Sequence, residues 1–257
     1  MYTDTEAIIL RQTKTLNGRR MLTIFSQKYG KIGAGTSISE KGRNKSALAL
    51  RPFCRGRYEL FKNRDSYNIQ GAEVIQSYFG IGEDVDKYFA ASYVLELMDY
   101  ILPDDVPQPA LFSMLSEFLS LLEKRKESFD TLVIAYQIKA LELFGSGIGI
   151  SECLRTGEPV DLKNQGPGPF PYLMSIPDGG VVSRSSIREE ELLNPLIFEI
   201  NADIIQVMSY ILRHPLSAME KLAIPQQTAA KIKSILSAYI SFHLGIDKLK
   251  SEGLSIY

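Results

Sequence analysis

The chain has 257 residues and a mass of 28.8 kDa, which exceeds one typical domain of ~100–200 residues, so two folded units are expected. Its 45% hydrophobic and 23% charged residues exclude a largely disordered chain, and no apolar run reaches the ~18 residues of a membrane helix. The net charge of −1 hides an asymmetry, because residues 1–64 hold 14 Lys and Arg against 4 Asp and Glu, or +10, which leaves −11 on the remainder. A basic segment this one-sided favours a polyanionic partner over a merely solvated surface.

The start of the chain lacks the basic flank and the apolar stretch of a signal peptide. Its two cysteines, Cys54 and Cys153, cannot build a disulfide framework, which agrees with a reducing compartment. We therefore expect a soluble cytoplasmic protein.

Residues 1–80 are expected to form a small β-barrel. Stretches in which apolar and polar residues alternate are typical of strands, and the turn-forming pairs Asn17-Gly18 and Tyr29-Gly30 separate the first three. The candidate strands lie at residues 7–10, 21–25, 31–34, 56–61 and 67–70. Five short strands in so brief a segment predict a barrel.

Residues 81–257 are expected to form a helical domain, because apolar residues recur every three or four positions. Stripes of this kind cover residues 85–101, 111–122, 129–144, 204–211 and 232–242. Pro103, Gly145, Pro215 and Gly245 are expected to end four of these helices. Between the third and fourth of these stripes, residues 146–195 are rich in Gly and Pro and show no sustained apolar period, which predicts an irregular insertion.

Catalytic chemistry has little support in the sequence. The two histidines, His214 and His243, lie at predicted helix ends, where a cation complements the helix dipole. Residues 145–149 are Gly-rich but follow a helix and lack the later Gly and Lys of a phosphate-binding loop. We expect no catalytic residue, no metal and no cofactor.

The basic side chains of the first domain fall on predicted turns and strands, close to the aromatic residues Phe53, Tyr58, Phe61 and Tyr67. A groove lined by cations follows a phosphate backbone, and aromatic faces stack on bases with little sequence preference. The predicted nucleic-acid-binding residues are Arg19, Arg20, Lys28, Lys31, Lys41, Arg43, Lys45, Arg51, Arg55, Arg57, Lys62 and Arg64.

The order of these parts resembles the bacterial RecO family of recombination mediators and DNA repair proteins over nearly the whole chain. The resemblance is distributed over several segments of the sequence. They are Ala7-Ile8-Ile9-Leu10, Leu22-Thr23-Ile24-Phe25 through Gly30-Lys31-Ile32, the basic loop Lys41-Gly42-Arg43 to Ser46, Pro52-Phe53, Tyr93 with Glu96-Leu97, Leu143-Phe144-Gly145, Cys153, Phe170, Gly179-Gly180, and Tyr239 with His243-Leu244-Gly245.

The resemblance implies an α+β multidomain fold, with an N-terminal oligonucleotide/oligosaccharide-binding (OB) barrel followed by a helical domain that carries a zinc-ribbon-like insertion. It also implies binding of single- and double-stranded DNA, annealing of complementary strands, and help in loading a recombinase onto strands coated by single-stranded-DNA-binding protein. The implied protein partners are RecR and the single-stranded-DNA-binding protein. The implied location is the cytoplasm, in association with the nucleoid.

The insertion departs from the family at its metal site. Members with zinc use two Cys-x-x-Cys pairs, and the matching positions here are Cys153 with Thr156 and Ser183 with Ser186. Structural zinc generally takes four Cys or His ligands, so the insertion is expected to have lost its metal ligands. We expect packing of Phe170, Tyr172 and Leu173 to order it instead.

Two other functions remain open from the sequence. One is a nucleic-acid-processing enzyme that uses the basic domain only for substrate capture, which cleavage of DNA with Mg²⁺ or Mn²⁺ would support. The other is a scaffold whose basic face binds an acidic protein or the negative C-terminal region of a second copy. Self-association that is lost on charge reversal, with DNA binding kept, would favour this scaffold.

Overall fold

The structure is a computed structural model that describes the chain except residues 15–19, 40–44, 65, 164–168, 248 and 252–257. The chain divides into two compact units. Unit 1 comprises residues 1–129 and 249–257, and unit 2 comprises residues 130–248. No helix in the described residues is both long and apolar enough to cross a membrane.

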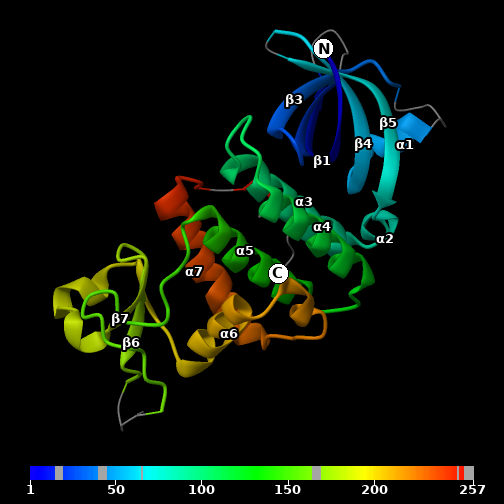
Figure 1. Cartoon of the computed structure of the whole chain (residues 1–257). Helices are drawn as coiled ribbons and strands as arrows, with labels where there is room; N and C mark the ends of the chain where they lie inside the picture. Colours follow the sequence, from blue (N-terminus) through cyan, green and yellow to red (C-terminus); the bar gives the residue numbers. More distant parts are fainter. Residues whose placement is uncertain (15–19, 40–44, 65, 164–168, 248, 252–257) are drawn as a thin grey trace. The chain divides into compact units, whose positions relative to one another are not determined.

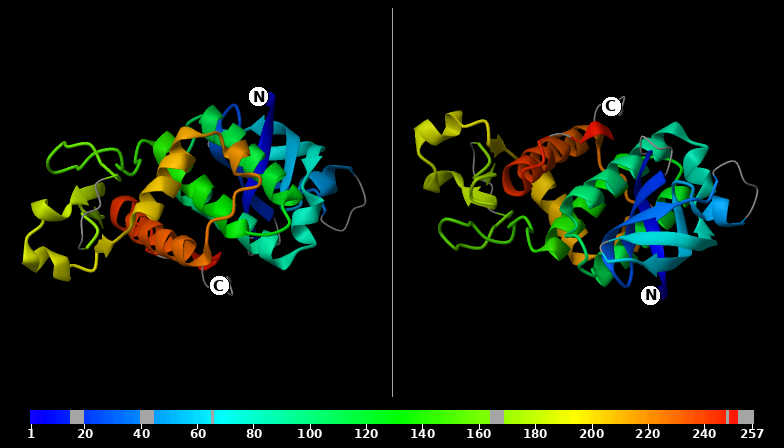
Figure 2. Two further views of the ribbon diagram at one scale, coloured as in Figure 1. Left: turned by 90° about the horizontal axis from the view of Figure 1, so that it is seen from below. Right: turned by 90° about the horizontal axis from the view of Figure 1, so that it is seen from above.

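Unit 1 contains a closed five-stranded barrel, whose strands can be followed in Figures 1 and 2. The strands are β1 (Tyr2–Lys14), β2 (Arg20–Ser26), β3 (Gly30–Thr36), β4 (Cys54–Lys62) and β5 (Tyr67–Ser77). Their order around the barrel is β1-β2-β3-β5-β4 with β4 returning to β1, and only the β3–β5 pairing is parallel. The predicted barrel is therefore present, and its strands extend well beyond the predicted stretches.

The alternation of apolar residues places one face of each strand inside the barrel. Leu22 and Ile24 of β2 meet Leu60 of β4 and Ile69 of β5 in one buried cluster. Tyr58 is also buried there, and its hydroxyl donates to the Ala49 carbonyl at 2.8 Å, at the end of the short helix α1 (Lys45–Ala49). The outward positions of β4 alternate with these, which places Arg55, Arg57 and Glu59 on the outer surface.

Helices α2 (Phe79–Gly82), α3 (Val85–Ile101) and α4 (Pro109–Lys124) complete unit 1. The side chain of Asp84 caps α3 by accepting from the N–H groups of Asp86 and Lys87, and Pro109 opens α4. The predicted domain boundary at residue 80 marks the change from strands to helices. The compact unit extends further because Phe112 of α4 packs edge-on against Phe25 of β2, with ring centroids 5.4 Å apart.

Unit 2 combines helices with a small sheet. Helices α5 (Phe129–Phe144), α6 (Ala202–Arg213) and α7 (Gln226–Leu244) match the three predicted stripes, and Gly245 ends α7 in the left-handed conformation. The segment expected to be irregular contains strands β6 (Tyr172–Ser175), β7 (Gly180–Ser183) and β8 (Ile197–Glu199) in the order β7-β6-β8. The periodicity missed them because strands of three or four residues carry almost no pattern. The 3₁₀ turns η1 (Arg184–Ser186), η2 (Glu189–Leu193) and η3 (Leu216–Met219) fill the connections.

The four positions considered for zinc lie together but do not fit the metal. The Cys153 sulfur accepts from the Ser183 N–H at 3.1 Å, and the Ser186 hydroxyl donates to the Ser183 carbonyl at 2.7 Å. Burial alone would raise the pKa of the Cys153 thiol, but hydrogen bonds from Thr156, Ser183 and Arg155 lower it to about 7. One thiol and three hydroxyls are not a zinc ligand set.

An arginine-centred network links the segments of the insertion. The Arg155 guanidinium donates to both carboxylate oxygens of Asp178 and to both of Glu191, and also to the Ser186 carbonyl. Leu173 packs with Cys153 in a small buried cluster, as expected. Phe170 and Tyr172 are both half-buried and their ring centroids lie 5.8 Å apart, so the aromatic packing expected here is only partial.

Replacing Arg155 is expected to destabilise unit 2 in a pH-dependent way. Hydrogen bonds from Arg155 and from the Arg188 N–H lower the pKa of Glu191 to about 2. Burial alone would raise the pKa of Asp178, but hydrogen bonds from Arg155 and Ser175 leave it lowered. Because both folded pKa values lie below their ordinary values, this stabilisation is complete above about pH 4.5 and is lost as the pH falls towards 2.

We therefore expect Arg155→Gln to lower the melting temperature by about 2–4 °C at pH 7, measured by circular dichroism. The difference from the unmodified chain should shrink as the pH falls from 5 to 2. Arg155→Lys, which keeps the charge but loses the planar fork, should be intermediate. An equal difference at every pH would show that the carboxylates do not contribute.

Candidate nucleic-acid interface

The predicted cations divide according to what the structure describes. Arg19, Lys41 and Arg43 lie outside the described residues, and Lys45 is described only as the backbone start of α1. The others belong to the barrel or its turns. They are Arg20, Lys28, Lys31, Arg51, Arg55, Arg57, Lys62 and Arg64.

Three of these cations are engaged within unit 1. Arg20 is buried and donates to the Ile38 carbonyl. Arg55 donates to the Glu6 carboxylate with both Nε and a terminal nitrogen, and its guanidinium lies 5.8 Å from the Phe112 ring centroid. Lys31 is 14% exposed and its Nζ lies 3.1 Å from Asp104 Oδ1. These contacts give the three side chains structural roles, so we do not place them in an exposed interface.

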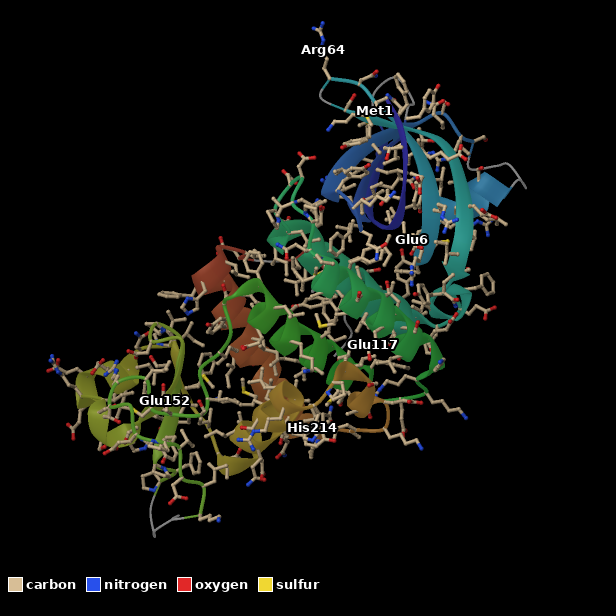
Figure 3. All side chains as sticks on the ribbon, in the orientation of Figure 1. Met1, Glu6, Arg64, Glu117, Glu152 and His214 are labelled. Carbon is tan, nitrogen blue, oxygen red and sulfur yellow. The ribbon has the colours of Figure 1, made fainter. Side chains whose placement is uncertain are left out.

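Exposed cations and aromatics meet at one end of the barrel, in a set that we call the barrel-end cluster: Tyr2, Lys28, Phe61, Lys62 and Arg64. Strand pairing sets Tyr2 of β1 opposite Phe61 of β4, and their ring centroids are 5.0 Å apart. Lys62 follows Phe61, and Arg64 projects from the β4–β5 loop at the same end as Met1 (Figure 3). Lys28, in the β2–β3 turn, donates from Nζ to the Asp4 carbonyl at 2.7 Å.

Few carboxylates pair with the cations of the cluster. Arg64 is exposed and makes no ion pair with any residue that the structure describes. Lys62 lies 5.2 Å from the Tyr67 ring centroid, and a hydrogen bond with that side chain raises the pKa of its ammonium group. The Lys28 ammonium is 3.5 Å from a carboxylate oxygen of Asp4, and both side chains are more than half exposed. An ion pair between side chains this exposed contributes little free energy, so a DNA phosphate can compete with the carboxylate for the cation.

Tyr2 is a candidate site residue that the sequence reasoning missed. Its side chain is 73% exposed, whereas Tyr58, Phe53 and Tyr67 among the predicted aromatics are buried, and only Phe61 is partly open. The sequence does not tell whether an aromatic residue at the start of a strand faces the barrel interior or the solvent. The position of the Tyr2 ring becomes clear only from its pairing with Phe61. An exposed ring beside cations is a surface on which a base stacks.

Two further predicted cations are exposed away from the cluster. Arg57, on the outer face of β4, is 57% exposed and lies 3.9 Å from Glu6. Arg51 is exposed in the turn before β4. On this outer face the exposed Glu59 lies between Arg57 and the cluster.

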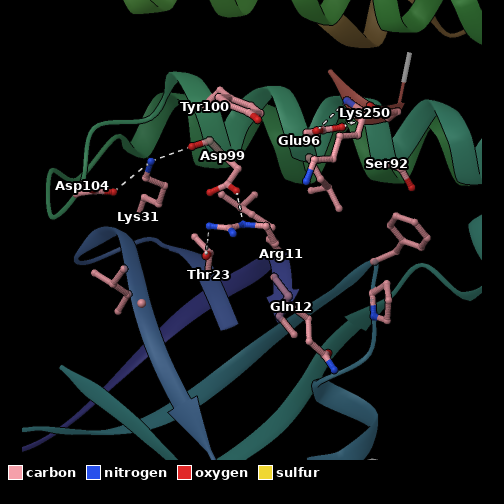
Figure 4. A pocket seen from close by; sticks show the side chains of 18 of the residues that line it. Arg11, Gln12, Thr23, Lys31, Ser92, Glu96, Asp99, Tyr100, Asp104 and Lys250 are labelled. Atoms are coloured by element: carbon pink, nitrogen blue, oxygen red, sulfur yellow. Dashed lines mark hydrogen bonds and ion pairs between the residues drawn. The ribbon is translucent and has the colours of Figure 1, made fainter. Parts of the chain in front are cut away.

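A second surface feature of unit 1 is a groove of about 900 Å³ between the outer face of β1–β3 and helix α3 (Figure 4). Arg11 of β1 and Lys31 of β3 project into it from the barrel. Asp99 and Asp104, from α3 and the following loop, face them. This wall of the barrel therefore carries cations that are already paired with carboxylates.

The histidines have structural contacts. His214, the C-cap of α6, stacks on Tyr210, and its Nδ1 lies 2.8 Å from the Tyr210 carbonyl oxygen. His243 lies in the last turn of α7, with Nε2 2.7 Å from the Ile176 carbonyl oxygen. Within the described residues there is no group of three or more His, Cys, Asp or Glu side chains arranged to hold a metal ion.

Comparison with known proteins agrees with this arrangement. The family domain described as "Recombination protein O N terminal" matches residues 1–78, and "Recombination protein O C terminal" matches residues 82–253. The chain belongs to the recombination protein O (RecO) family. The junction of the two RecO domains, at residues 78–82, lies at the predicted change from barrel to helices.

Several relatives in the RecO family match over nearly their whole length. A protein of Alkaliphilus metalliredigens is 24% identical over 256 residues, which cover 100% of this chain and 98% of the relative. A protein of Pelotomaculum thermopropionicum is 27% identical over 246 residues, covering 96% and 90%. One of Myxococcus xanthus is 25% identical over 249 residues, covering 96% and 94%. Each is named DNA repair protein RecO.

Proposed function

We propose that this chain acts in DNA repair and homologous recombination as a non-enzymatic mediator that binds single- and double-stranded DNA. The observation that carries the proposal is the barrel-end cluster, in which the exposed Tyr2 ring lies beside Lys62 and Arg64. Cations of this kind neutralise phosphates of either form of DNA, whereas an exposed ring stacks only on bases that are free of a duplex.

The fold of unit 1 supports the proposal. We take the five-stranded barrel, with its order β1-β2-β3-β5-β4, to be an OB fold. OB folds bind oligonucleotides with the loops after strands 1 and 4 and with the face of strands 2 and 3. Arg64 lies in the loop after β4, and the predicted Arg19 comes between β1 and β2 in the sequence, outside the described residues.

Annealing of complementary strands follows from the same surface. It requires two strands held close together, with their charge repulsion neutralised and their bases accessible, and no bond is made or broken. We further propose that the chain assists recombinase loading onto strands coated by single-stranded-DNA-binding protein, with that protein and RecR as partners. Membership of the RecO family supports this part of the proposal.

The test is fluorescence anisotropy of labelled single-stranded and duplex oligonucleotides with the unmodified chain and with Tyr2→Ala. The unmodified chain should bind both, and the affinity should fall steeply with salt. Tyr2→Ala should weaken single-strand binding by roughly 5- to 150-fold, the range for loss of ~1–3 kcal/mol of base stacking, and should leave duplex binding nearly unchanged.

Tyr2→Phe serves as the matched control, because it keeps the ring and should keep the affinity. Equal losses for single strand and duplex in Tyr2→Ala would mean that the ring does not stack on bases. No binding by the unmodified chain at low salt would overturn the proposed function itself.

A further inference from the structure

The charges of unit 1 are divided between two consecutive stretches of its sequence. Residues 1–64 carry +10, whereas residues 65–123 hold 1 Lys against 11 Asp and Glu, or −10. The basic stretch forms β1 to β4 and α1, and the acidic stretch forms β5, α2, α3 and most of α4. Because both stretches belong to one compact unit, unit 1 carries opposite charges on its two parts.

Several carboxylates of the acidic stretch are already engaged within unit 1. Asp99 accepts from Arg11 Nε at 2.7 Å. Glu96 accepts from the N–H groups of Lys250 and Ser251 at 3.0 and 2.9 Å, and from the Ser251 hydroxyl at 2.7 Å. A partner would therefore be met by carboxylates elsewhere in this stretch.

Exposed apolar side chains gather where α2 leads into α3, in a set that we call the α2–α3 patch: Phe79, Glu83, Val85, Asp86 and Tyr88. Phe79 and Val85 are each 65% exposed, and Tyr88 is 43% exposed. Val85 and Tyr88 are three residues apart on α3 and so lie side by side on its surface. Glu83 is exposed and makes no ion pair with any residue that the structure describes. Apolar side chains this exposed, rimmed by polar ones, are typical of an interaction surface.

The single lysine of the acidic stretch, Lys87, contacts α4. Its Nζ donates to the Glu123 carbonyl at 2.7 Å and lies 5.9 Å from the Phe129 ring centroid. The Glu123 carboxylate in turn accepts from the Gly80 N–H of α2 at 3.1 Å, so a further negative charge lies beside the patch. The α2–α3 patch is thus an apolar surface with an acidic rim.

The α2–α3 patch and the barrel-end cluster lie at opposite ends of strand β5 (Figure 1). Tyr67, the first residue of β5, pairs with Lys62 of the cluster. Ser77, the last residue of β5, comes just before α2. A strand of 11 residues separates the two surfaces by on the order of 30 Å. One copy of the chain cannot bring them together, but two copies can.

The two surfaces are complementary in charge and in apolar character. The barrel-end cluster presents exposed cations around the paired rings of Tyr2 and Phe61. The α2–α3 patch presents carboxylates around Phe79, Val85 and Tyr88. Opposite potentials on two surfaces favour their encounter, and the apolar side chains provide area to bury once they meet.

We propose that the chain self-associates head to tail, with the barrel-end cluster of one copy bound to the α2–α3 patch of the next. Each copy presents both surfaces, so the contact is heterologous and can repeat beyond two copies. The cations involved are those proposed for DNA, so a second copy and DNA should compete for them. This competition rests on the proposed function, whereas self-association does not.

The experiment is sedimentation equilibrium of the full chain over a range of protein and salt concentrations. At low salt the weight-average mass should rise with protein concentration and pass that of a dimer. At high salt it should fall to that of the monomer, because salt screens the attraction between exposed charges.

Two charge-reversal variants test which surfaces meet. Glu83→Lys/Asp86→Lys and Lys62→Glu/Arg64→Glu should each be monomeric at low salt, because the two surfaces of each variant then have the same sign. An equimolar mixture of the two should associate again, since the intact cluster of one variant meets the intact patch of the other.

The control for net charge is Glu189→Lys/Glu190→Lys, which makes the same charge change at exposed positions of η2 in unit 2. It should keep self-association. Phe79→Ser/Val85→Ser keeps every charge and should weaken association about tenfold or more, because two apolar side chains are no longer buried at the contact. Glu83→Lys alone changes an exposed side chain, so it should fold and weaken association even if the double patch variant does not fold.

A chain that stays monomeric at low salt would overturn the inference, as would a mass that stops at the dimer or a mixture of variants that stays monomeric. An added single-stranded oligonucleotide should dissociate the assembly. Self-association by a chain that binds no oligonucleotide would count against the proposed function alone, and DNA binding by a strictly monomeric chain would count against the inference alone.

Discussion

Charge reversal of Arg57, Lys62 and Arg64 to glutamate is expected to reduce the affinity for single-stranded DNA roughly 100-fold or more and to weaken duplex binding as well. All three side chains are exposed along β4 and the loop that follows it. Among the described residues they make an ion pair of 3.9 Å between Arg57 and Glu6 and a contact between Lys62 and the Tyr67 ring. Loss of three phosphate contacts should also flatten the salt slope for single strands by about 2.1.

The measurement is an anisotropy titration of both DNA forms from low to high salt. The control variant reverses three exposed lysines elsewhere, Lys124, Lys126 and Lys221, and so makes the same change in net charge. It should reduce affinity far less and keep the slope. If both variants lost affinity equally, the effect would come from net charge, and the barrel-end cluster would not be the contact surface.

The second large effect is expected at Gly180, where Gly180→Ala should lower the melting temperature by about 3–10 °C. Gly149 and Gly180 form a parallel backbone bridge, and the Val181 N–H donates to the Gly149 carbonyl at 2.7 Å. A Cβ on Gly180 would lie 2.0 Å from the Gly149 carbonyl oxygen. Because the obstacle is backbone, no rotamer change relieves it, and the bridge must open.

Differential scanning calorimetry would measure this loss, and limited proteolysis would show whether cleavage moves into residues 146–195. Gly82→Ala is the control, since a Cβ there meets nothing within 4 Å. It should leave the melting temperature nearly unchanged. Unaltered stability and proteolysis in Gly180→Ala would contradict the role given to the bridge between Gly149 and Gly180.

The sequence predicted elements that have a repeating pattern or a clear stop signal. The barrel was predicted from alternating strands, and α3 begins at Val85, the first residue of its apolar stripe. Strands β6, β7 and β8 were not predicted because each spans only three or four residues, too few for an alternating pattern to show. Their place in the fold depends on contacts such as that of Gly149 with Gly180, which no local pattern encodes.

The candidate site was predicted in composition but not in arrangement. Counting cations identified the basic barrel, yet a count does not distinguish Arg55, which is bound to Glu6, from Arg64, which projects into solvent. The carboxylate that engages Arg11 comes from α3, 88 residues further along the chain. Only the folded chain shows which charges are already paired, and therefore which remain for a ligand.

The hydrogen bonds of Glu96 with Lys250 and Ser251 also have a consequence for the order of folding. Unit 2 is inserted within unit 1, because the chain leaves unit 1 after Phe129 and returns to it at Leu249. During synthesis the barrel and α3 emerge before unit 2, but the partners of Glu96 are made only after it. The last contacts of unit 1 therefore form only after all of unit 2 has been translated. A ribosome that stalls within α7 leaves unit 1 without the hydrogen bonds of Glu96 to Lys250 and Ser251.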